Sequence, residues 1–238
     1  MEFKKISDRI YYLEHEDVSD TPALGYVRGD VFSLMVDAGT GKAHVERFMS
    51  ALEENELPEP FFSVITHHHW DHSFGMASLE AITIACKNCA KKLEPFEDIK
   101  WTEERFAELL QAGTIPTFCE EHIRMAYPDL SEIEVFCPDM IFEGEMVIDL
   151  GGCKAVIMQI PSPHGRDCIA VYVPEEKILF IGDALYEGIV GSNWVDDPEE
   201  IQKLQKVLRN LDFETCIDSH NGPMTKYDAL ANLAERVN

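Results

Sequence analysis

The stretch that decides the fold is Phe61-Phe62-Ser63-Val64-Ile65-Thr66-His67-His68-His69-Trp70-Asp71-His72. Its first five residues form a short apolar run, which is typical of a buried strand. The run leads into histidines and an aspartate, the side chains that most often bind zinc and related divalent cations. In an extended segment, residues i and i+2 project to the same side, so His67 and His69 can hold one ion together. As the chain turns into a helix, Asp71 and His72 come round and can reach a second ion.

The two residues between the candidate ligands, His68 and Trp70, are expected to pack the loop and to form a wall of the site. A histidine-rich surface loop, or a tract like an affinity tag, is the alternative interpretation of the cluster. The cluster lies at the end of a strand, which is where α/β folds build their sites, and this position favours a functional role.

Three further candidate ligands, His164, Asp183 and His220, each come just past a predicted strand and close to glycine or proline. Taken singly, each has an ordinary alternative. A lone histidine beside proline is more often a turn residue, and a lone aspartate after a strand more often caps a helix. Their shared context, taken together with the first cluster, favours one metal centre assembled from distant parts of the chain.

The rest of the pattern alternates strands and helices. Strands are predicted at residues 6–15, 26–37, 61–65, 81–85, 133–137, 145–150, 153–160, 168–173, 177–182 and 214–218. Helices are predicted at 42–56, 102–111 and 119–127, from the N-cap Asp197 to about residue 211, and at 224–236. This order favours two sheets in the middle with helices outside. We expect a single domain over residues 1–238, with a helical insertion near 96–130 that packs on it.

Charge and composition exclude several classes of protein. The 238 residues include 20 basic and 44 acidic side chains, a net charge of −24. Such a surface repels phosphate backbones and anionic membranes, so we expect no nucleic-acid or membrane partner. No stretch approaches the roughly 20 apolar residues of a membrane-spanning helix, and the N-terminus lacks an apolar signal core. The seven scattered cysteines then indicate reduced thiols and a cytoplasmic protein.

With these residues in view, the chain resembles the metallo-β-lactamase-fold superfamily of hydrolases over about residues 6–225. The resemblance rests on His67-x-His69-x-Asp71-His72, His164, Gly182-Asp183 and His220, in the order of that superfamily. Two contexts depart from its usual pattern: Pro161-Ser162-Pro163 precedes His164, and Asp218-Ser219 precedes His220. The resemblance implies an α/β fold, specifically a four-layer αβ/βα sandwich, with a two-metal site at one edge of the sheets.

The resemblance also implies roles for individual residues. His67, His69 and His164 would hold one metal; Asp71, His72 and His220 would hold the other; and Asp183 would bridge them. Zinc is the default from the ligand types, while manganese and iron accept the same set. A hydroxide between the two ions would attack the substrate. Asp71 and Tyr186 are the candidate catalytic residues, and Tyr186 would either hydrogen-bond the substrate carbonyl, as in resembling lactonases, or line the pocket.

Within the superfamily, the residues favour some branches over others. Histidine at position 69 disfavours the oxygen-reducing flavodiiron branch, Asp183 disfavours true β-lactamases, and the charge of −24 disfavours nucleic-acid processing. The hypothesis that remains is hydrolysis of a small-molecule ester, thioester or lactone, as in the glyoxalase II, lactonase and thioesterase branch. Alternatives are a phosphodiesterase, an oxidoreductase resembling the mononuclear-iron sulfur dioxygenases, and a binding domain without catalysis. We make no prediction of the oligomeric state.

Three further features have weaker interpretations. Cys86-Lys87-Asn88-Cys89 is a CxxC that could be a redox pair or half of a structural zinc site, but no second CxxC follows. Arg166 could pair with a substrate carboxylate or phosphate, or equally with a surface acid. Aromatic residues of the 96–130 insertion could cover the site and favour an apolar substrate, although most are expected to seat the insertion on the domain. These aromatic residues are Trp101, Phe106, Phe118 and Tyr127.

Overall fold

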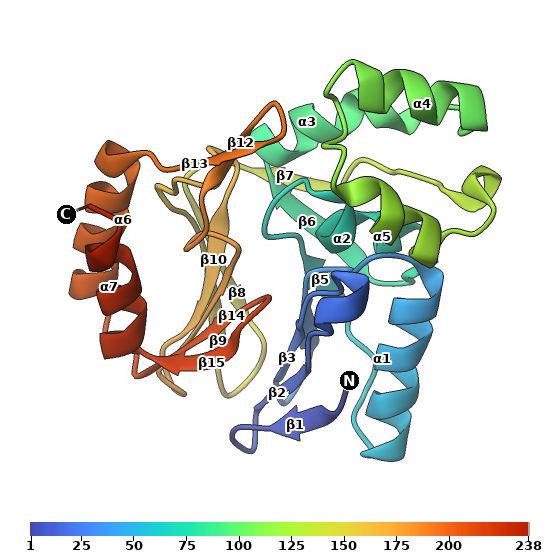
Figure 1. The fold of residues 1–238 in the computed structure, drawn as a ribbon. Coiled ribbons are helices and arrows are strands. Elements are labelled where there is room, and N and C mark those ends of the chain that lie inside the picture. The colour runs from blue at the N-terminus through green and yellow to red at the C-terminus, as the bar shows by residue number, and fades with distance from the viewer. Residues whose placement is uncertain (238) are drawn as a thin grey trace.

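Two large β-sheets lie face to face in the middle of the molecule, and helices cover both outer faces (Figure 1). The computed structural model describes residues 1–237. Apolar residues on both faces of a sheet must be buried, and a second sheet on one side with helices on the other achieves this. The predicted αβ/βα sandwich is therefore confirmed.

The first sheet has seven strands in chain order, β1-β2-β3-β4-β5-β6-β7. The strands are β1 (Phe3–Lys5), β2 (Ile10–Leu13), β3 (Leu24–Arg28), β4 (Ser33–Val36), β5 (Phe62–Val64), β6 (Ile82–Cys86) and β7 (Met140–Phe142). Strands β1 to β4 pair antiparallel, whereas β4 to β7 pair parallel. The parallel strands β4, β5 and β6 therefore end at the same edge, and β5 delivers the histidine-rich segment there.

The second sheet has six strands in the order β15-β14-β11-β10-β9-β8. The strands are β8 (Glu145–Asp149), β9 (Lys154–Gln159), β10 (Ile169–Val173), β11 (Ile178–Gly182), β14 (Thr215–Asp218) and β15 (Gly222–Thr225). Only β11 and β14 pair parallel, and the other neighbours are antiparallel. Because β11 and β14 run the same way, the residues that follow them meet at one edge.

Helices cover the two outer faces (Figure 1). They are α1 (Lys42–Glu54), α2 (Trp70–Ser73), α3 (Lys87–Glu97), α4 (Glu103–Gln111), α5 (Cys119–Ala126), α6 (Pro198–Asn210) and α7 (Lys226–Glu235). Helices α6 and α7 pack together outside the second sheet, while α1 and α3 lie outside the first. None of the helices within residues 1–237 combines the length and apolar character that crossing a bilayer requires.

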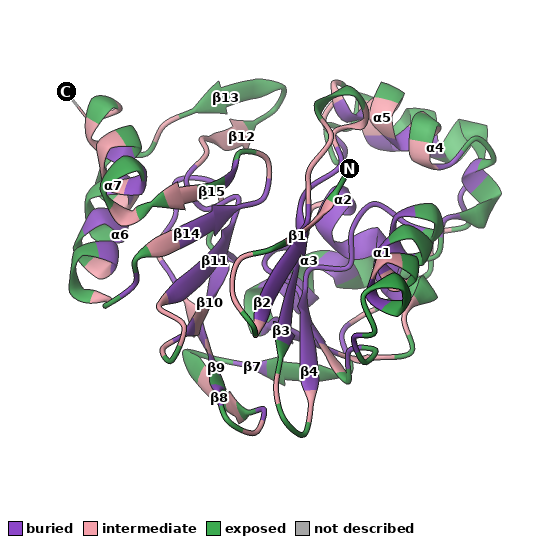
Figure 2. Ribbon diagram, turned by 90° about the horizontal axis from the view of Figure 1, so that it is seen from below, coloured by how far each residue is buried: buried purple, intermediate pink, exposed green. Residues whose placement is uncertain are grey.

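Side chains alternate between two cores along the central strands. In β11, Ile178 and Phe180 point into the core between the sheets, whereas Leu179 and Ile181 pack in the core under α6 and α7. Successive residues of a strand face opposite sides of its sheet, so a strand buried on both faces is apolar throughout. Figure 2 accordingly shows the middle strands of both sheets as buried.

Some predicted elements were wrong. Residues 133–137 form no strand, and the strand that pairs with β6 is β7, which begins after Pro138. The segment 26–37 is two antiparallel strands, β3 and β4, rather than one. Helix α3, the last strand β15 and a two-stranded hairpin of β12 (Gly188–Val190) and β13 (Asn193–Val195) were not predicted. The insertion near 96–130 contains α4 and α5, close to the helices predicted there.

Candidate metal centre

The segment after β5 brings four of the candidate ligands to the edge of the first sheet. His67 and His69 lie in the loop, and Asp71 and His72 lie in the first turn of the short helix α2. His67, Asp71 and His72 are buried and His69 is half-buried. The transition from extended chain to helix therefore turns the second pair away from the first, as the spacing predicted.

The other three candidate ligands come from the second sheet. His164 lies in the loop after β9, Asp183 directly follows β11, and His220 lies two residues beyond β14. Because the edges of the two sheets meet, all seven side chains converge into two groups that share Asp183. The predicted convergence of residues up to 153 positions apart is thus present in the structure.

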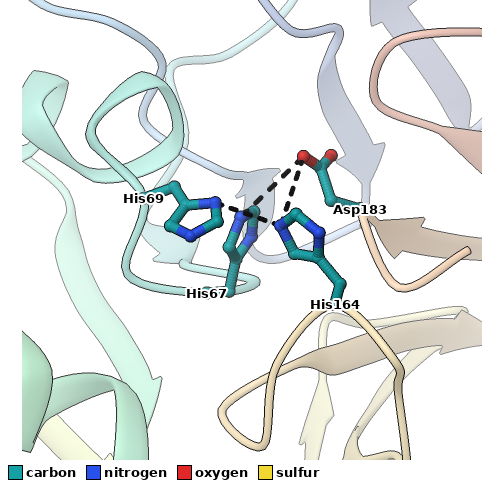
Figure 3. A group of neighbouring side chains, drawn as sticks. All are labelled: His67, His69, His164 and Asp183. Carbon is teal, nitrogen blue, oxygen red and sulfur yellow. Dashed lines mark hydrogen bonds and ion pairs between the residues drawn. The ribbon is translucent and has the colours of Figure 1, made fainter. Parts of the chain in front are cut away.

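The first group contains His67, His69, His164 and Asp183, and their side chains point toward one another (Figure 3). His164 Nε2 lies 3.0 Å from His69 Nδ1 and 3.8 Å from Asp183 Oδ2. His67 Nε2 lies 3.9 Å from the same carboxylate oxygen. One ligand atom from each residue lies within 4.8 Å of all the others, so a single cation can contact all four groups.

The second group contains Asp71, His72, His220 and again Asp183. Asp71 Oδ2 lies 3.1 Å from His72 Nε2 and 3.2 Å from His220 Nε2. Asp183 Oδ1 lies 3.4 Å from His72 Nε2, and Asp183 Oδ2 lies 3.5 Å from His220 Nε2. The two oxygens of Asp183 thus face both groups, which is the arrangement expected of a bridging carboxylate.

Three atoms at the heart of these groups fit a bound cation. His67 Nε2, His72 Nε2 and Asp183 Oδ1 are buried and accept or donate no hydrogen bond. A buried polar atom without a partner costs about 1–3 kcal/mol. Imidazole nitrogen and carboxylate oxygen are ligands for zinc and its divalent relatives, and a cation between the atoms would satisfy each of them. The two clusters therefore fit divalent-metal binding.

The electrostatics of the two groups differ. Burial lowers the pKa of His67, His69 and His164, which keeps these imidazoles neutral. Burial also opposes charge on His72 and His220, but Asp183 and Asp71 outweigh it and raise the pKa of both histidines. The second group thus carries concentrated negative charge that stabilises cations.

Asp37 belongs to neither group of ligands but holds the histidine-rich segment in place, a role that was not predicted from the sequence. Its Oδ2 lies 2.8 Å from His72 Nδ1 and accepts from the Thr66 hydroxyl at 3.0 Å, while its Oδ1 accepts from the Thr66 backbone N–H at 2.7 Å. The carboxylate accepts, so Nδ1 of His72 carries the proton and Nε2 is left free for a cation. Its φ of 65° and the glycine two residues further on are typical of a turn, so its local sequence gives no sign of this role.

The loops that depart from the superfamily pattern have their own hydrogen bonds. Ser162 Oγ accepts from the backbone N–H of His164 at 3.0 Å and donates to Ala184 O at 3.1 Å. His164 Nδ1 donates to the backbone oxygen of Glu187 at 2.7 Å, which leaves its Nε2 without a proton and able to bind a cation. Asp218 Oδ1 accepts from the backbone N–H of His220 at 3.1 Å. Ser162 and Asp218 therefore set the positions of the two histidines.

His68 is held by a buried carboxylate that the sequence did not single out. Asp167 Oδ2 lies 2.8 Å from His68 Nδ1 and accepts from the His68 backbone N–H at 3.0 Å, and its Oδ1 pairs with Lys92 Nζ at 2.6 Å. Cys86 donates its thiol proton to the Asp167 backbone oxygen. Both Cys86 and Cys89 are fully buried free thiols, and burial raises the pKa of each, so neither is poised for redox chemistry.

A cavity of about 650 Å³ opens onto both groups of ligands. Its apolar walls come from the insertion and from the β12–β13 hairpin, where the rings of Phe118 and Trp194 stack 5.2 Å apart. His68 and Trp70 line it, as predicted. Of the aromatic residues of the insertion that were expected to cover the site, only Phe118 lines the cavity. The other three, Trp101, Phe106 and Tyr127, are buried in the core, as expected for most of them.

Tyr186 and Arg166 differ in their access to this cavity. Tyr186 lines it, and its hydroxyl donates to Asp218 Oδ1 at 3.2 Å and accepts from Asn221 Nδ2. Burial and the neighbouring Asp218 raise the pKa of Tyr186, so the hydroxyl is neutral. Arg166 is exposed and does not line the cavity, and its backbone oxygen accepts from Asn88. The guanidinium is therefore not a substrate contact within this cavity.

Comparison with known proteins places this geometry in a family. The family model described as the metallo-beta-lactamase superfamily matches residues 24–220. Among curated proteins, the chain is similar to the acyl-coenzyme A thioesterase MBLAC2 of Gallus gallus, 28% identical over 210 residues, covering 82% of this chain and 70% of that one. The protein of the same name from Bos taurus is 23% identical over 197 residues, covering 78% and 66%. The matches thus span about two thirds of these relatives' own length.

A solved structure shares the fold. The metallo-beta-lactamase from Pontibacter korlensis superposes with a TM-score of 0.67 at 19% identity, covering 98% of both chains. The family model accounts for most of the sequence, and it spans the whole range from His67 to His220. The chain belongs to the metallo-beta-lactamase superfamily, whose fold it shares.

Proposed function

We propose that the protein is a dinuclear enzyme that hydrolyses small-molecule esters, thioesters or lactones. The observation that carries the proposal is the position of Asp183, whose two oxygens lie within 3.9 Å of imidazole nitrogens from both ligand groups. A shared carboxylate is the simplest way to hold two cations close together, because its charge offsets their mutual repulsion. The presence of a second complete group of potential ligands supports a second ion.

In this proposal, His67, His69 and His164 hold one ion, Asp71, His72 and His220 hold the other, and Asp183 contacts both. Zinc is the favoured metal, because imidazole and carboxylate are its usual ligands in hydrolases. Two such ions, when bound, lower the pKa of water to near neutrality and polarise the oxygen of a scissile carbonyl.

The protein's own residues supply orientation and shielding. Asp37 and Thr66 hold His72 and the loop in place, and Asp71 places negative charge beside the imidazoles of His72 and His220. The apolar side chains of the lining, among them Phe118, lower the polarity around the site, which strengthens each electrostatic contact inside. Tyr186 would either reorient its hydroxyl toward the substrate carbonyl or serve as a wall.

Two observations support a carbonyl substrate. The curated relatives are named as acyl-coenzyme A thioesterases, which cleave a carbonyl–sulfur bond. The cavity is large enough for a drug-sized molecule and mainly apolar, which suits an acyl group.

The proposal is tested by loading the purified protein with zinc and assaying a panel of thioesters, lactones and phosphodiesters. We expect metal-dependent cleavage of at least one carbonyl substrate and loss of that activity in Asp183→Ala. An exposed acid far from the site, Asp8, provides the matched control Asp8→Ala. Activity confined to phosphodiesters, or no activity with fully loaded protein, would refute the proposal.

A further inference from the structure

The charge of the cavity lining restricts the substrate. Among the described residues that line the cavity there is no lysine and no arginine. The lining does contain carboxylates outside the two ligand groups, namely Asp17, Asp20 and Glu187. Enzymes that bind anionic groups usually provide a guanidinium or ammonium to receive them, and this cavity provides neither.

Two of these carboxylates, Asp17 and Asp20, have only histidines as ion-pair partners among the described residues. Both belong to the short 3₁₀ turn that follows β2. Asp17 lies 3.5 Å from His15, and Asp20 lies 3.8 Å from both His122 and His220. Within residues 1–237, no lysine or arginine forms an ion pair with either one. Their charge therefore acts on whatever occupies the cavity.

Two bound dications would not make the electrostatic potential of the cavity strongly positive. Of their four positive charges, Asp71 and Asp183 offset two as ligands, and Asp17 and Asp20 offset the remainder from the wall. Glu187 is accompanied by Arg236, whose Nη2 lies 3.9 Å from its carboxylate. The occupied site is thus close to neutral, inside a protein whose net charge of −24 repels anions.

Another part of the cavity lining is apolar. Phe118 and Trp194 stack on each other, and the Trp194 ring lies 6.4 Å from that of His164. The lining therefore offers a bound molecule both an apolar surface and carboxylates. On the basis of the function proposed above, we propose that the cavity accepts esters with an apolar acyl group and a neutral or cationic leaving group, and discriminates against negative charge inside the cavity.

This restriction applies only to groups that enter the cavity. A coenzyme A ester carries its phosphates at the far end of an uncharged pantetheine arm, so it satisfies the rule where it contacts the site. An ester with a carboxylate a few bonds from the scissile carbonyl does not. The cavity is therefore expected to distinguish substrates by the position of their charge and not by the bond that is broken.

The test uses three butyryl thioesters of similar size, whose thiols are N-acetylcysteamine, thiocholine and 3-mercaptopropionate. Zinc-loaded protein is assayed for thiol release at low ionic strength. We expect kcat/KM for the neutral and cationic esters to exceed that for the anionic ester by at least about tenfold. Because salt screens charges over roughly 10 Å at 0.1 M and roughly 3 Å at 1 M, the ratio should shrink toward one as salt is added.

Variants of Asp17 test whether the negative charge of the cavity lining causes the preference against the anionic ester. This side chain is 88% exposed, so its replacement leaves the core intact. Asp17→Asn should reduce the preference against the anionic ester severalfold, and Asp17→Lys should reduce it further. Asp8→Asn, which removes a fully exposed acid elsewhere, should leave the ratio unchanged.

The outcomes separate the two proposals. Cleavage of all three esters at similar kcat/KM, or a preference that neither salt nor Asp17→Lys alters, would overturn the charge rule while leaving the hydrolase proposal intact. Failure to cleave any carbonyl substrate would overturn both.

Discussion

The replacement Asp37→Asn tests whether the support behind His72 matters for metal binding. Asp37 is 1% exposed and accepts three hydrogen bonds, two from Thr66 and one from His72 Nδ1. Asparagine has nearly the same shape and tolerates the φ of 65°, so backbone strain is not introduced. Its amide oxygen can still accept from the Thr66 backbone, but its NH₂ group would face two donors.

The magnitude follows from the bond that His72 loses. A hydrogen bond to a charged group contributes about 1.5–3 kcal/mol. At about 1.4 kcal/mol per tenfold in affinity, the loss corresponds to roughly a ten- to hundredfold weaker metal site. The same range is typical when a residue that orients a metal-bound histidine is removed.

The assay is a competition titration of zinc between the protein and a chelator of known affinity, at constant pH. A circular-dichroism spectrum of the metal-free variant controls for folding, and Asp8→Asn controls for the loss of one acid. Zinc affinity within twofold of the unmodified protein would refute the argument that Asp37 orients His72.

Four further predictions concern the centre and the core. Asp183→Ala should lower the zinc content to at most one ion per chain and remove turnover, measured by elemental analysis and ester assay; full metal content would contradict the shared-ligand geometry. Tyr186→Phe should reduce kcat/KM less than about fivefold, because its hydroxyl is engaged by a buried carboxylate, whereas a hundredfold loss would show that it contacts substrate. Zinc uptake at pH 7 should release protons, which an indicator dye detects, because the carboxylates raise the pKa of His72 and His220 above 6.5 and both histidines must lose a proton to bind the metal. The zinc affinity should therefore fall as the pH falls. Zinc uptake without proton release would contradict the direction of these pKa shifts. Leu208→Ala, in the fully buried core under α6, should destabilise by about 2–5 kcal/mol in urea unfolding, and a change below 1 kcal/mol would contradict its placement.

Much of the fold was predictable because periodicity and caps act locally. The helix α6 begins where the sequence predicts, since Asp197 accepts from the backbone N–H groups of Glu199 and Glu200 and Pro198 occupies the first turn. The central strands are apolar runs because both faces are buried. Helix α3 was missed because Pro95 interrupts its apolar pattern, although Cys89 within the helix is a core residue.

The candidate ligands were predictable for a different reason: the type of a residue and its position after a predicted strand can both be seen in the sequence. Their supporting residues were not. Asp37 lies 35 positions from His72, and Asp167 lies 99 positions from His68, and nothing in either local sequence distinguishes them from ordinary turn acids. The β12–β13 hairpin was also missed, because its strands are only three residues long, pair only with each other and leave most of their side chains exposed.

The central claim is that seven side chains hold two cations, and the most direct test is anomalous diffraction from crystals of the zinc-loaded protein. The account predicts two peaks about 3.5–4 Å apart, one among His67, His69 and His164 and the other among Asp71, His72 and His220, with Asp183 between them. A single fully occupied peak, or zinc bound elsewhere with these side chains left empty, would contradict it.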